Sequence, residues 1–296
     1  MITSAFTCTG PYAILILLGI KRVENRNVLP TPSKGRCAIS CSKSFTKDEY
    51  GEFVRWAARS LSAEEFETIP AWNEVKNWPG KIVGTCDYSS RSRNDLVLSD
   101  DRAPNGKITW DEGYDCWWDL SEVVCFERPI PCRGNVGMWQ MPPALAAQVD
   151  AADFLSRQIG ERIAAAEDAA RIFHAALPIA RESEGFFVLP LDEKRRVLAE
   201  PVLVSLGTSS VATTVLPGEV FSAALTVGAK SIIVAHNHPS GDLTPSLQDR
   251  QLTTALASLG EQLGVKLLDH LVIGKNGEYE RISLATNGMA AQPRFF

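Results

Sequence analysis

The chain of 296 residues has no long apolar run and no basic excess. Its longest early apolar run, residues 13–20, is far shorter than the roughly 20 residues that cross a bilayer. This run precedes Lys21 and Arg22, whereas a signal peptide carries its positive charge in front. The formal net charge is −5, and neither half has more basic than acidic residues, which excludes a domain that grips duplex DNA along its length. We expect a cytoplasmic protein without membrane partners.

The sequence also lacks Cys-x-x-Cys pairs, internal repeats and low-complexity tracts. All seven cysteines lie in the first half, and their odd number does not fit a disulfide framework. We expect reduced cysteines that pack as small apolar side chains, with zinc on Cys37 and Cys41 as the less favoured alternative. The absence of repeats excludes solenoids and propellers.

A change in composition near Pro142 and Pro143 predicts two domains. The sequence before it is rich in Trp, Pro, Gly and Cys and contains short β-type runs. Residues 144–176 contain one Gly and no Pro, and their apolar residues recur every three or four positions, which predicts one or two helices. The predicted organisation is a β-rich domain over 1–142, a helical connector over 143–180 and an α/β domain over 181–296.

The last third alternates between strand and helix patterns. Residues 231–235 are continuously apolar, as expected of a buried strand, and residues 246–263 are amphipathic with a helical period. The predicted strands are 186–191, 201–206, 231–235 and 267–273, and the predicted helices are 219–226 and 246–263.

The most informative segment follows the strand 231–235 directly. His236 and His238 project to the same side if the chain stays extended, because side chains alternate along a strand. Pro245 suits the start of a helix, and Asp249 lies on the first turn of that helix, facing back toward the loop. Two imidazoles and one carboxylate suit Zn²⁺, and three protein ligands leave the fourth tetrahedral position to water, as in catalytic zinc sites.

Each part of this segment also has a simpler explanation. Ser246 and Asp249 have the spacing of a capping box at a helix N-terminus, and His236 alone suits an ordinary strand end. The joint spacing H-x-H-x₇-S-x₂-D in a strand–loop–helix context favours the metal site.

This spacing resembles the JAMM (MPN+) metalloprotease motif, and residues 184–282 are similar to RadC-like JAB domains. The similarity is carried by residues 206–208, 216–221 and 269–274 and by the His-Asn-His-Pro-Ser-Gly core. It implies a three-layer α/β fold similar to cytidine deaminases, with zinc held by His236, His238 and Asp249. The serine that matches Ser246 supports the tetrahedral intermediate in that family.

The resemblance also requires a glutamate that moves protons between water and the leaving amine. Glu184 precedes the first strand, where the JAMM glutamate stands, and we favour it; Glu219 and Glu182 are the alternatives. Asp269 and His270 are expected either next to the ligands or in a structural ion pair or cap.

Residues 11–141 resemble the ASCH domain, a small PUA-like β-barrel. The resemblance is carried, in order, by residues 11–13, 19–26, 35–43, 80–84 and 129–139. It implies an RNA or nucleotide-like ligand near Lys21, Glu24 and Arg26, for which ordinary surface charge is the alternative. Most of the tryptophans available for stacking are expected in the core; they are Trp110, Trp117, Trp118 and Trp139.

The sequence therefore predicts a two-domain α+β and α/β protein. Its leading interpretation is a zinc-dependent JAMM-type peptidase or isopeptidase that uses metal-activated water on a peptide or isopeptide-linked protein substrate. The alternative is a non-catalytic, nucleic-acid-associated accessory protein, as in RadC-like DNA repair. A third option is hydrolysis of a modified base by the front domain, independent of His236 and His238.

Overall fold

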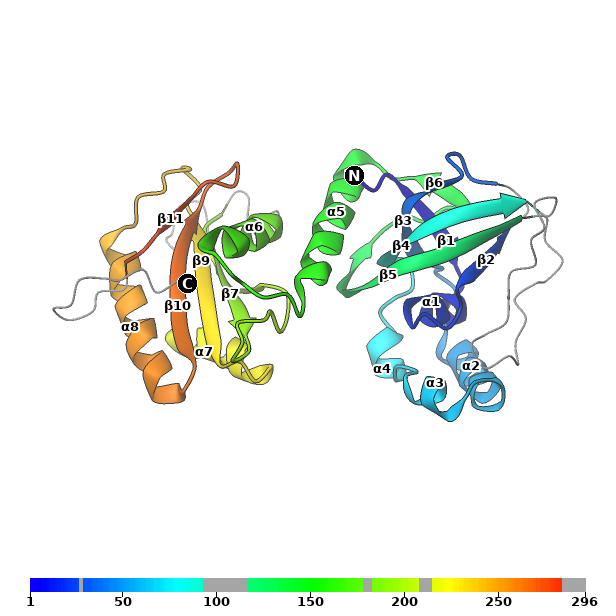
Figure 1. Cartoon of the computed structure of the whole chain (residues 1–296), viewed down its shortest axis with the longest axis horizontal. Coiled ribbons are helices and arrows are strands. Elements are labelled where there is room, and N and C mark those ends of the chain that lie inside the picture. The colour runs from blue at the N-terminus through cyan, green and yellow to red at the C-terminus, as the bar shows by residue number, and fades with distance from the viewer. Residues whose placement is uncertain (27–28, 93–115, 178–182, 208–214, 284–296) are drawn as a thin grey trace. The chain divides into compact units, whose positions relative to one another are not determined.

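The computed structural model describes residues 1–26, 29–92, 116–177, 183–207 and 215–283. The chain forms two compact units, 1–153 and 154–296, which are described separately (Figure 1).

The N-terminal unit is built on a mixed sheet with the strand order β2-β5-β4-β3-β1-β6. Strand β1 is parallel to β3, and the other pairs are antiparallel. The strands are β1 (Ser4–Cys8), β2 (Val23–Arg26), β3 (Lys34–Cys41), β4 (Lys81–Ser92), β5 (Cys116–Pro131) and β6 (Met138–Gln140). The helices are α1 (Gly10–Leu17), α2 (Lys47–Ser60), α3 (Ala63–Glu67) and α4 (Trp72–Val75). The PUA-like barrel stays a prediction.

Helix α1 packs inside the N-terminal unit. Its run of Ala13, Ile14, Leu15 and Ile16 is buried in one core with residues of the sheet, because the helix is apolar on nearly every side. The helix begins at Gly10, where an added Cβ would lie 2.1 Å from the ring of Phe45. Only glycine allows this close approach, which fixes the start of α1 beside the loop that follows β3.

The C-terminal unit contains a mixed sheet with the order β11-β10-β9-β7-β8. The strands are β7 (Gly185–Leu191), β8 (Val202–Leu206), β9 (Ser231–Asn237), β10 (Lys266–Ile273) and β11 (Tyr279–Arg281). The helices are α6 (Ala166–Ala176), α7 (Pro217–Thr226) and α8 (Leu247–Leu263). All six elements predicted for this region are present, with ends that differ by a residue or two.

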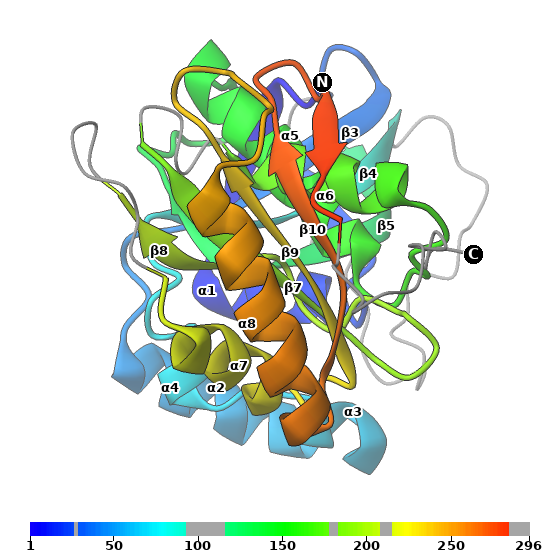
Figure 2. The ribbon, with the colours of Figure 1, turned by 90° about the vertical axis from the view of Figure 1, so that its left-hand side faces the viewer.

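Alternation along β9 builds three layers. Ile233 and Ala235 pack in the core that includes α6, whereas Ile232 and Val234 pack in the core that includes α7 and α8. Figures 1 and 2 show α6 on one face of this sheet and α7 and α8 on the other. The α/β architecture predicted for this part of the chain is confirmed.

The helical segment between the two sheets is shared between the units. Helix α5 (Pro143–Gln158) begins in the first unit, where Ala146 and Val149 are buried. Its last residues belong to the second unit, where Leu155 joins the core formed with α6. The described part of 143–180 therefore packs as portions of both units rather than as a separate connector.

The cysteines are all free, and most are buried as expected; Cys125 is exposed. Cys37 and Cys86 lie opposite each other on β3 and β4, with their Sγ atoms 3.9 Å apart. No helix in the described ranges combines the length and apolar character that crossing a bilayer requires.

Candidate metal centre and N-terminal cavity

The register of β7, β9 and β10 brings the predicted site residues to one edge of the C-terminal sheet. Phe186 at the start of β7 pairs with His236 at the end of β9, because these strands are antiparallel. Glu184, just before β7, is therefore at the edge where β9 delivers His236 and His238. Helix α8 begins after the loop that follows β9 and carries Asp249 in its first turn.

The two histidines and the aspartate have their ligand atoms close together. His236 Nε2 lies 3.1 Å from His238 Nε2 and 3.3 Å from Asp249 Oδ1. His238 Nε2 lies 3.7 Å from Asp249 Oδ2, and one ligand atom from each of the three side chains lies within 4.8 Å of the others. The His236 side chain is only 1% exposed. The three groups can therefore reach one common ion.

Charge interactions keep the carboxylate ionised. Burial by itself raises the pKa of Asp249, but the contacts with His236 and His238 outweigh it and hold the pKa well below its usual range. The contact with Asp249 raises the pKa of His238, with burial opposing it and the carboxylate of Glu184 adding to it. A deprotonated Asp249 is the form that can ligate a metal.

Ser246 forms the capping box that was the simpler explanation for this segment. Its main-chain N–H and its hydroxyl donate to Asp249 Oδ2 at 2.7 and 2.6 Å, and the Asp249 N–H donates to Ser246 Oγ at 3.1 Å. Asp249 Oδ1 is the oxygen nearest His236. The cap and the ligand role are therefore compatible, because they use different oxygens of one carboxylate.

The backbone on both sides of Glu184 is clamped by Asn237, a residue that the sequence reasoning missed. Asn237 Nδ2 donates to the carbonyl oxygen of Ser183 at 2.9 Å, and Asn237 Oδ1 accepts from the N–H of Gly185 at 3.0 Å. The N–H of Gly207 donates to the carbonyl oxygen of Glu184 at 2.7 Å. The position of an amide between the two histidines, on the opposite face of β9, is the sequence signal for this role.

Of the other candidate glutamates, Glu219 has different surroundings from Glu184. Glu219 is exposed in the first turn of α7, and its N–H donates to the carbonyl oxygen of Leu216. Glu182 lies outside the described residues.

His270 and Asp269 have separate roles. His270 is fully buried on β10, with its Nε2 atom 2.9 Å from His236 Nδ1 and its Nδ1 atom 2.7 Å from Thr253 Oγ1. Burial, reinforced by His236, lowers the pKa of His270 well below its ordinary value, so this imidazole is neutral. Asp269 instead accepts a hydrogen bond of 2.7 Å from Arg281 Nε, the structural ion pair of the two alternatives. Thr253 was not predicted, although it lies four residues after Asp249 on the same helix face.

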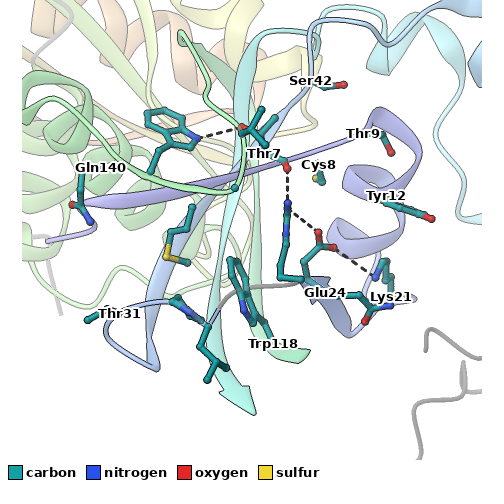
Figure 3. A pocket seen from close by; sticks show the side chains of 18 residues that line it. Thr7, Cys8, Thr9, Tyr12, Lys21, Glu24, Thr31, Ser42, Trp118 and Gln140 are labelled. Atoms are coloured by element: carbon teal, nitrogen blue, oxygen red, sulfur yellow. Dashed lines mark hydrogen bonds and ion pairs between the residues drawn. The ribbon is translucent and has the colours of Figure 1, made fainter. Parts of the chain in front are cut away.

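A second cluster lies in the N-terminal unit, where Lys21, Glu24 and Arg26 line a cavity of about 760 Å³ (Figure 3). Arg26 Nη2 lies 2.8 Å from Glu24 Oε1, and Lys21 Nζ lies 3.6 Å from Glu24 Oε2. Lys21 and Glu24 are buried, so the alternative of ordinary surface charge is wrong.

Aromatic side chains complete the wall of this cavity. Trp118 and Trp139 are buried, as expected, and both line the cavity. The guanidinium of Arg26 lies 5.5 Å from the ring centroid of Trp118, and its Nη2 donates to the carbonyl oxygen of Thr7 at 2.9 Å. Trp117 is also buried, and Trp110 lies outside the described residues.

Comparison with known proteins identifies the C-terminal unit. Residues 163–289 match the family model of the RadC-like JAB domain. The chain is 39% identical over 122 residues to a UPF0758 protein of Chlorobaculum parvum, which covers 41% of this chain and 53% of that protein. It is 37% identical over 154 residues to a UPF0758 protein of Syntrophotalea carbinolica, which covers 50% and 65% respectively. The chain therefore spans about half to two thirds of the length of these relatives.

The predicted similarity of the C-terminal unit to RadC-like JAB domains is thus supported by this match. This match favours the nucleic-acid-associated alternative at least as strongly as a JAMM peptidase, because it identifies the domain and not an activity. The ASCH resemblance of residues 11–141 stays a prediction.

Proposed function

We propose that the RadC-like JAB domain binds a zinc ion through His236, His238 and Asp249 and hydrolyses an amide or isopeptide bond. The observation that carries this proposal is the short distance between three groups that can accept hydrogen bonds, His236 Nε2, His238 Nε2 and the carboxylate of Asp249. His238 Nδ1 lies 2.6 Å from the carbonyl oxygen of Asp242, which can only accept, so Nδ1 bears a proton, and in the neutral imidazole Nε2 presents a lone pair.

A metal ion or a proton on His238 can balance the acceptor groups that meet in this space. The lone pair of His238 Nε2 faces both His236 Nε2 and the carboxylate of Asp249 within 4 Å. Such groups repel one another unless a proton or a metal ion lies among them. Two nitrogens and one oxygen are donors typical of zinc, and three protein ligands are typical of a catalytic site.

A bound zinc ion supplies Lewis acidity, which polarises a carbonyl and lowers the pKa of water to about 7. Glu184 would accept a proton from the attacking water and return it to the leaving amine. We favour Glu184 over Glu219 because its backbone is clamped at this edge and its charge acts on His238. The hydroxyl of Ser246 would turn from Asp249 Oδ2 to donate to the developing oxyanion.

The test uses the full-length protein purified without added metal. We expect about one zinc per chain by elemental analysis, and cleavage of peptide or isopeptide-linked substrates that a chelator abolishes and zinc restores. A protein that takes up no zinc even when zinc is supplied would contradict the metal site. Zinc binding without hydrolysis of either substrate class would contradict the hydrolase and leave the metal site standing.

A second candidate function is the nucleic-acid-associated accessory role, which the RadC-like match favours. In this case the full chain should bind DNA or RNA with an affinity that falls as salt rises, and a His236→Ala variant without metal should bind equally well. For the hydrolase, cleavage of amide or isopeptide substrates is present in the wild type and lost in this variant. Binding of RNA at the N-terminal cavity is expected with either function and does not separate them.

The N-terminal cavity supports an RNA or nucleotide-like ligand for the predicted ASCH domain. The buried Trp118 Nε1 has no hydrogen-bond acceptor among the described residues, and Trp118 lines the cavity with Lys21 and Arg26. An aromatic ring, a free donor and cationic groups suit a single base and its phosphate. Titration with nucleotides and single-stranded RNA tests this proposal: Trp118→Phe should weaken binding, and equal binding by the variant would contradict it.

The third option, hydrolysis of a modified base by the N-terminal unit, requires an activity that persists in a variant without His236 and His238.

A further inference from the structure

His236 is the first member of a series of buried, hydrogen-bonded polar side chains, and the proposed chemistry does not use the other two members. His236 on β9, His270 on β10 and Thr253 on α8 are each no more than 1% exposed. They are linked in series by contacts of 2.9 Å, from His236 Nδ1 to His270 Nε2, and 2.7 Å, from His270 Nδ1 to Thr253 Oγ1. Polar groups at this depth must be satisfied by one another, so the direction of each hydrogen bond can be worked out.

The donor and acceptor in each of these hydrogen bonds follow from Thr253, the last member of the series. Thr253 Oγ1 lies 2.6 Å from the main-chain carbonyl oxygen of Asp249, which can only accept. The single hydroxyl proton of Thr253 is therefore donated to Asp249, and Thr253 Oγ1 must accept from His270 Nδ1. His270 is fully buried and its ring contacts another imidazole and a hydroxyl, an environment that disfavours a charged ring. A neutral imidazole has one N–H, so His270 Nε2 carries a lone pair and accepts from His236 Nδ1.

We propose that His270 and Thr253 are positioning residues that hold His236 in the Nδ1–H tautomer and so turn its Nε2 lone pair toward the metal. This inference rests on the proposed metal site. It makes the two histidines equivalent as ligands, because the carbonyl oxygen of Asp242 holds His238 in the same tautomer. A hydrogen bond to the distal nitrogen of a ligating histidine is the common way in which proteins fix ring orientation and raise ligand basicity.

The series of bonds returns to the site through Asp249. The carbonyl oxygen of Asp249 receives the last hydrogen bond, and its carboxylate lies 3.3 Å from His236 Nε2. The first turn of α8 therefore supplies one proposed ligand, the Asp249 carboxylate, and helps to orient another, His236, through the carbonyl oxygen of Asp249. Phe186, stacked on His236 at a centroid distance of 6.1 Å with an interplanar angle of 9°, limits rotation of the same ring.

The chain contains a matched control for Thr253. Thr254, the next residue of α8, makes the equivalent hydroxyl bond to the carbonyl oxygen of Arg250 at 3.0 Å, but it is exposed. Thr253→Val and Thr254→Val each remove one hydrogen bond from a hydroxyl to the carbonyl oxygen four residues earlier, and each keeps the side-chain shape. Only Thr253→Val also removes the acceptor for His270, and Thr253→Ser restores it.

The experiment measures two quantities in full-length protein. The first is the zinc affinity, from competition with a chromophoric chelator. The second is the tautomer of His236 in zinc-free protein, from nitrogen-15 NMR shifts at about pH 8, where an ordinary imidazole is neutral. We expect Thr253→Val to lower zinc affinity about 10- to 100-fold and to release His236 from the Nδ1–H form. Thr253→Ser and Thr254→Val should match the wild type in both measurements.

Two results would overturn the inference. One is an Nε2–H tautomer of His236 in the wild type, which can be read whether or not the variants fold or zinc binds. The other is a folded Thr253→Val protein with unchanged zinc affinity and tautomer. A wild type that binds no zinc but keeps the Nδ1–H tautomer would contradict the proposed function while leaving the hydrogen-bonded series intact.

Discussion

The polar clusters described in the two units, each of which includes buried side chains, are built on opposite principles. In the N-terminal cluster the positive charges of Lys21 and Arg26 lie beside the negative charge of Glu24, so groups of opposite charge face one another. In the C-terminal cluster, three groups that can all present lone pairs face each other. Burial alone therefore does not separate a structural network from a metal site. The deciding feature is whether donors and acceptors balance without an added ion.

The largest effect is expected when an acceptor is removed from the C-terminal cluster. His236→Ala should abolish stoichiometric zinc, because two remaining ligands do not make a catalytic zinc site. His174→Ala is the matched control, since His174 is partly exposed on α6 and contacts the carbonyl oxygen of Lys275 instead. Elemental analysis of both variants checks the prediction. Full zinc content in His236→Ala would place the ion elsewhere.

A change that keeps the metal but removes the proton carrier should have the next largest effect. Glu184→Gln is expected to retain zinc and to lower turnover about 10²- to 10⁴-fold, the usual contribution of a general base. Glu219→Gln, an exposed residue of α7, should leave turnover unchanged. Parallel measurement of zinc content and hydrolysis distinguishes the two. Undiminished turnover in Glu184→Gln, or a loss confined to Glu219→Gln, would reverse the assignment.

In the N-terminal cluster the expected effect is on stability rather than on metal binding. Glu24→Gln leaves Lys21 and Arg26 without their counter-charge and should lower the free energy of unfolding by about 3 kcal/mol. All seven tryptophans lie in the first 153 residues, so tryptophan fluorescence during urea denaturation reports on this unit alone. Glu52→Gln, at an exposed position of α2, is the control. Equal stability of the two variants would show that the charge network is not needed for folding.

The sequence was sufficient to predict that the three proposed ligands lie together, and insufficient to predict the residues that contact them. His236, His238 and Asp249 could be predicted because strand alternation and a helix start fix where those side chains point. The pairing of His270 with His236 depends on the register of β9 against β10, which no local pattern specifies. The register of β7 against β9 likewise places Asn237 where it hydrogen-bonds to the backbone on both sides of Glu184.

The assignment of the helices within 144–176 to the two units also could not be predicted from the sequence. Helical periodicity predicted the helices within 144–176, and α5 and α6 are present there. Periodicity does not say which core an apolar face joins, because that choice depends on tertiary packing. Val149 is buried in the core with Trp139, whereas Leu155 joins the core with Phe173.

The smallest expected effect concerns Asp269, a buried carboxylate of the C-terminal unit that, like Glu24, is paired with an arginine. Burial raises the pKa of Asp269 to about 6 from 3.8, although Arg281 opposes the shift. A carboxyl group with a raised pKa in the folded state stabilises the fold below pH 3.8 and loses that contribution as the pH rises through about 6.

The free energy of unfolding of the wild type should therefore fall relative to that of Asp269→Asn between about pH 4 and pH 6, by about 2 kcal/mol. Equilibrium urea denaturation at several pH values, followed by circular dichroism, measures the difference between the two proteins. The difference isolates Asp269 because both proteins share every other titrating group. Parallel pH profiles would mean that Arg281 offsets the cost of burial, and that this pair is as well compensated as the N-terminal cluster.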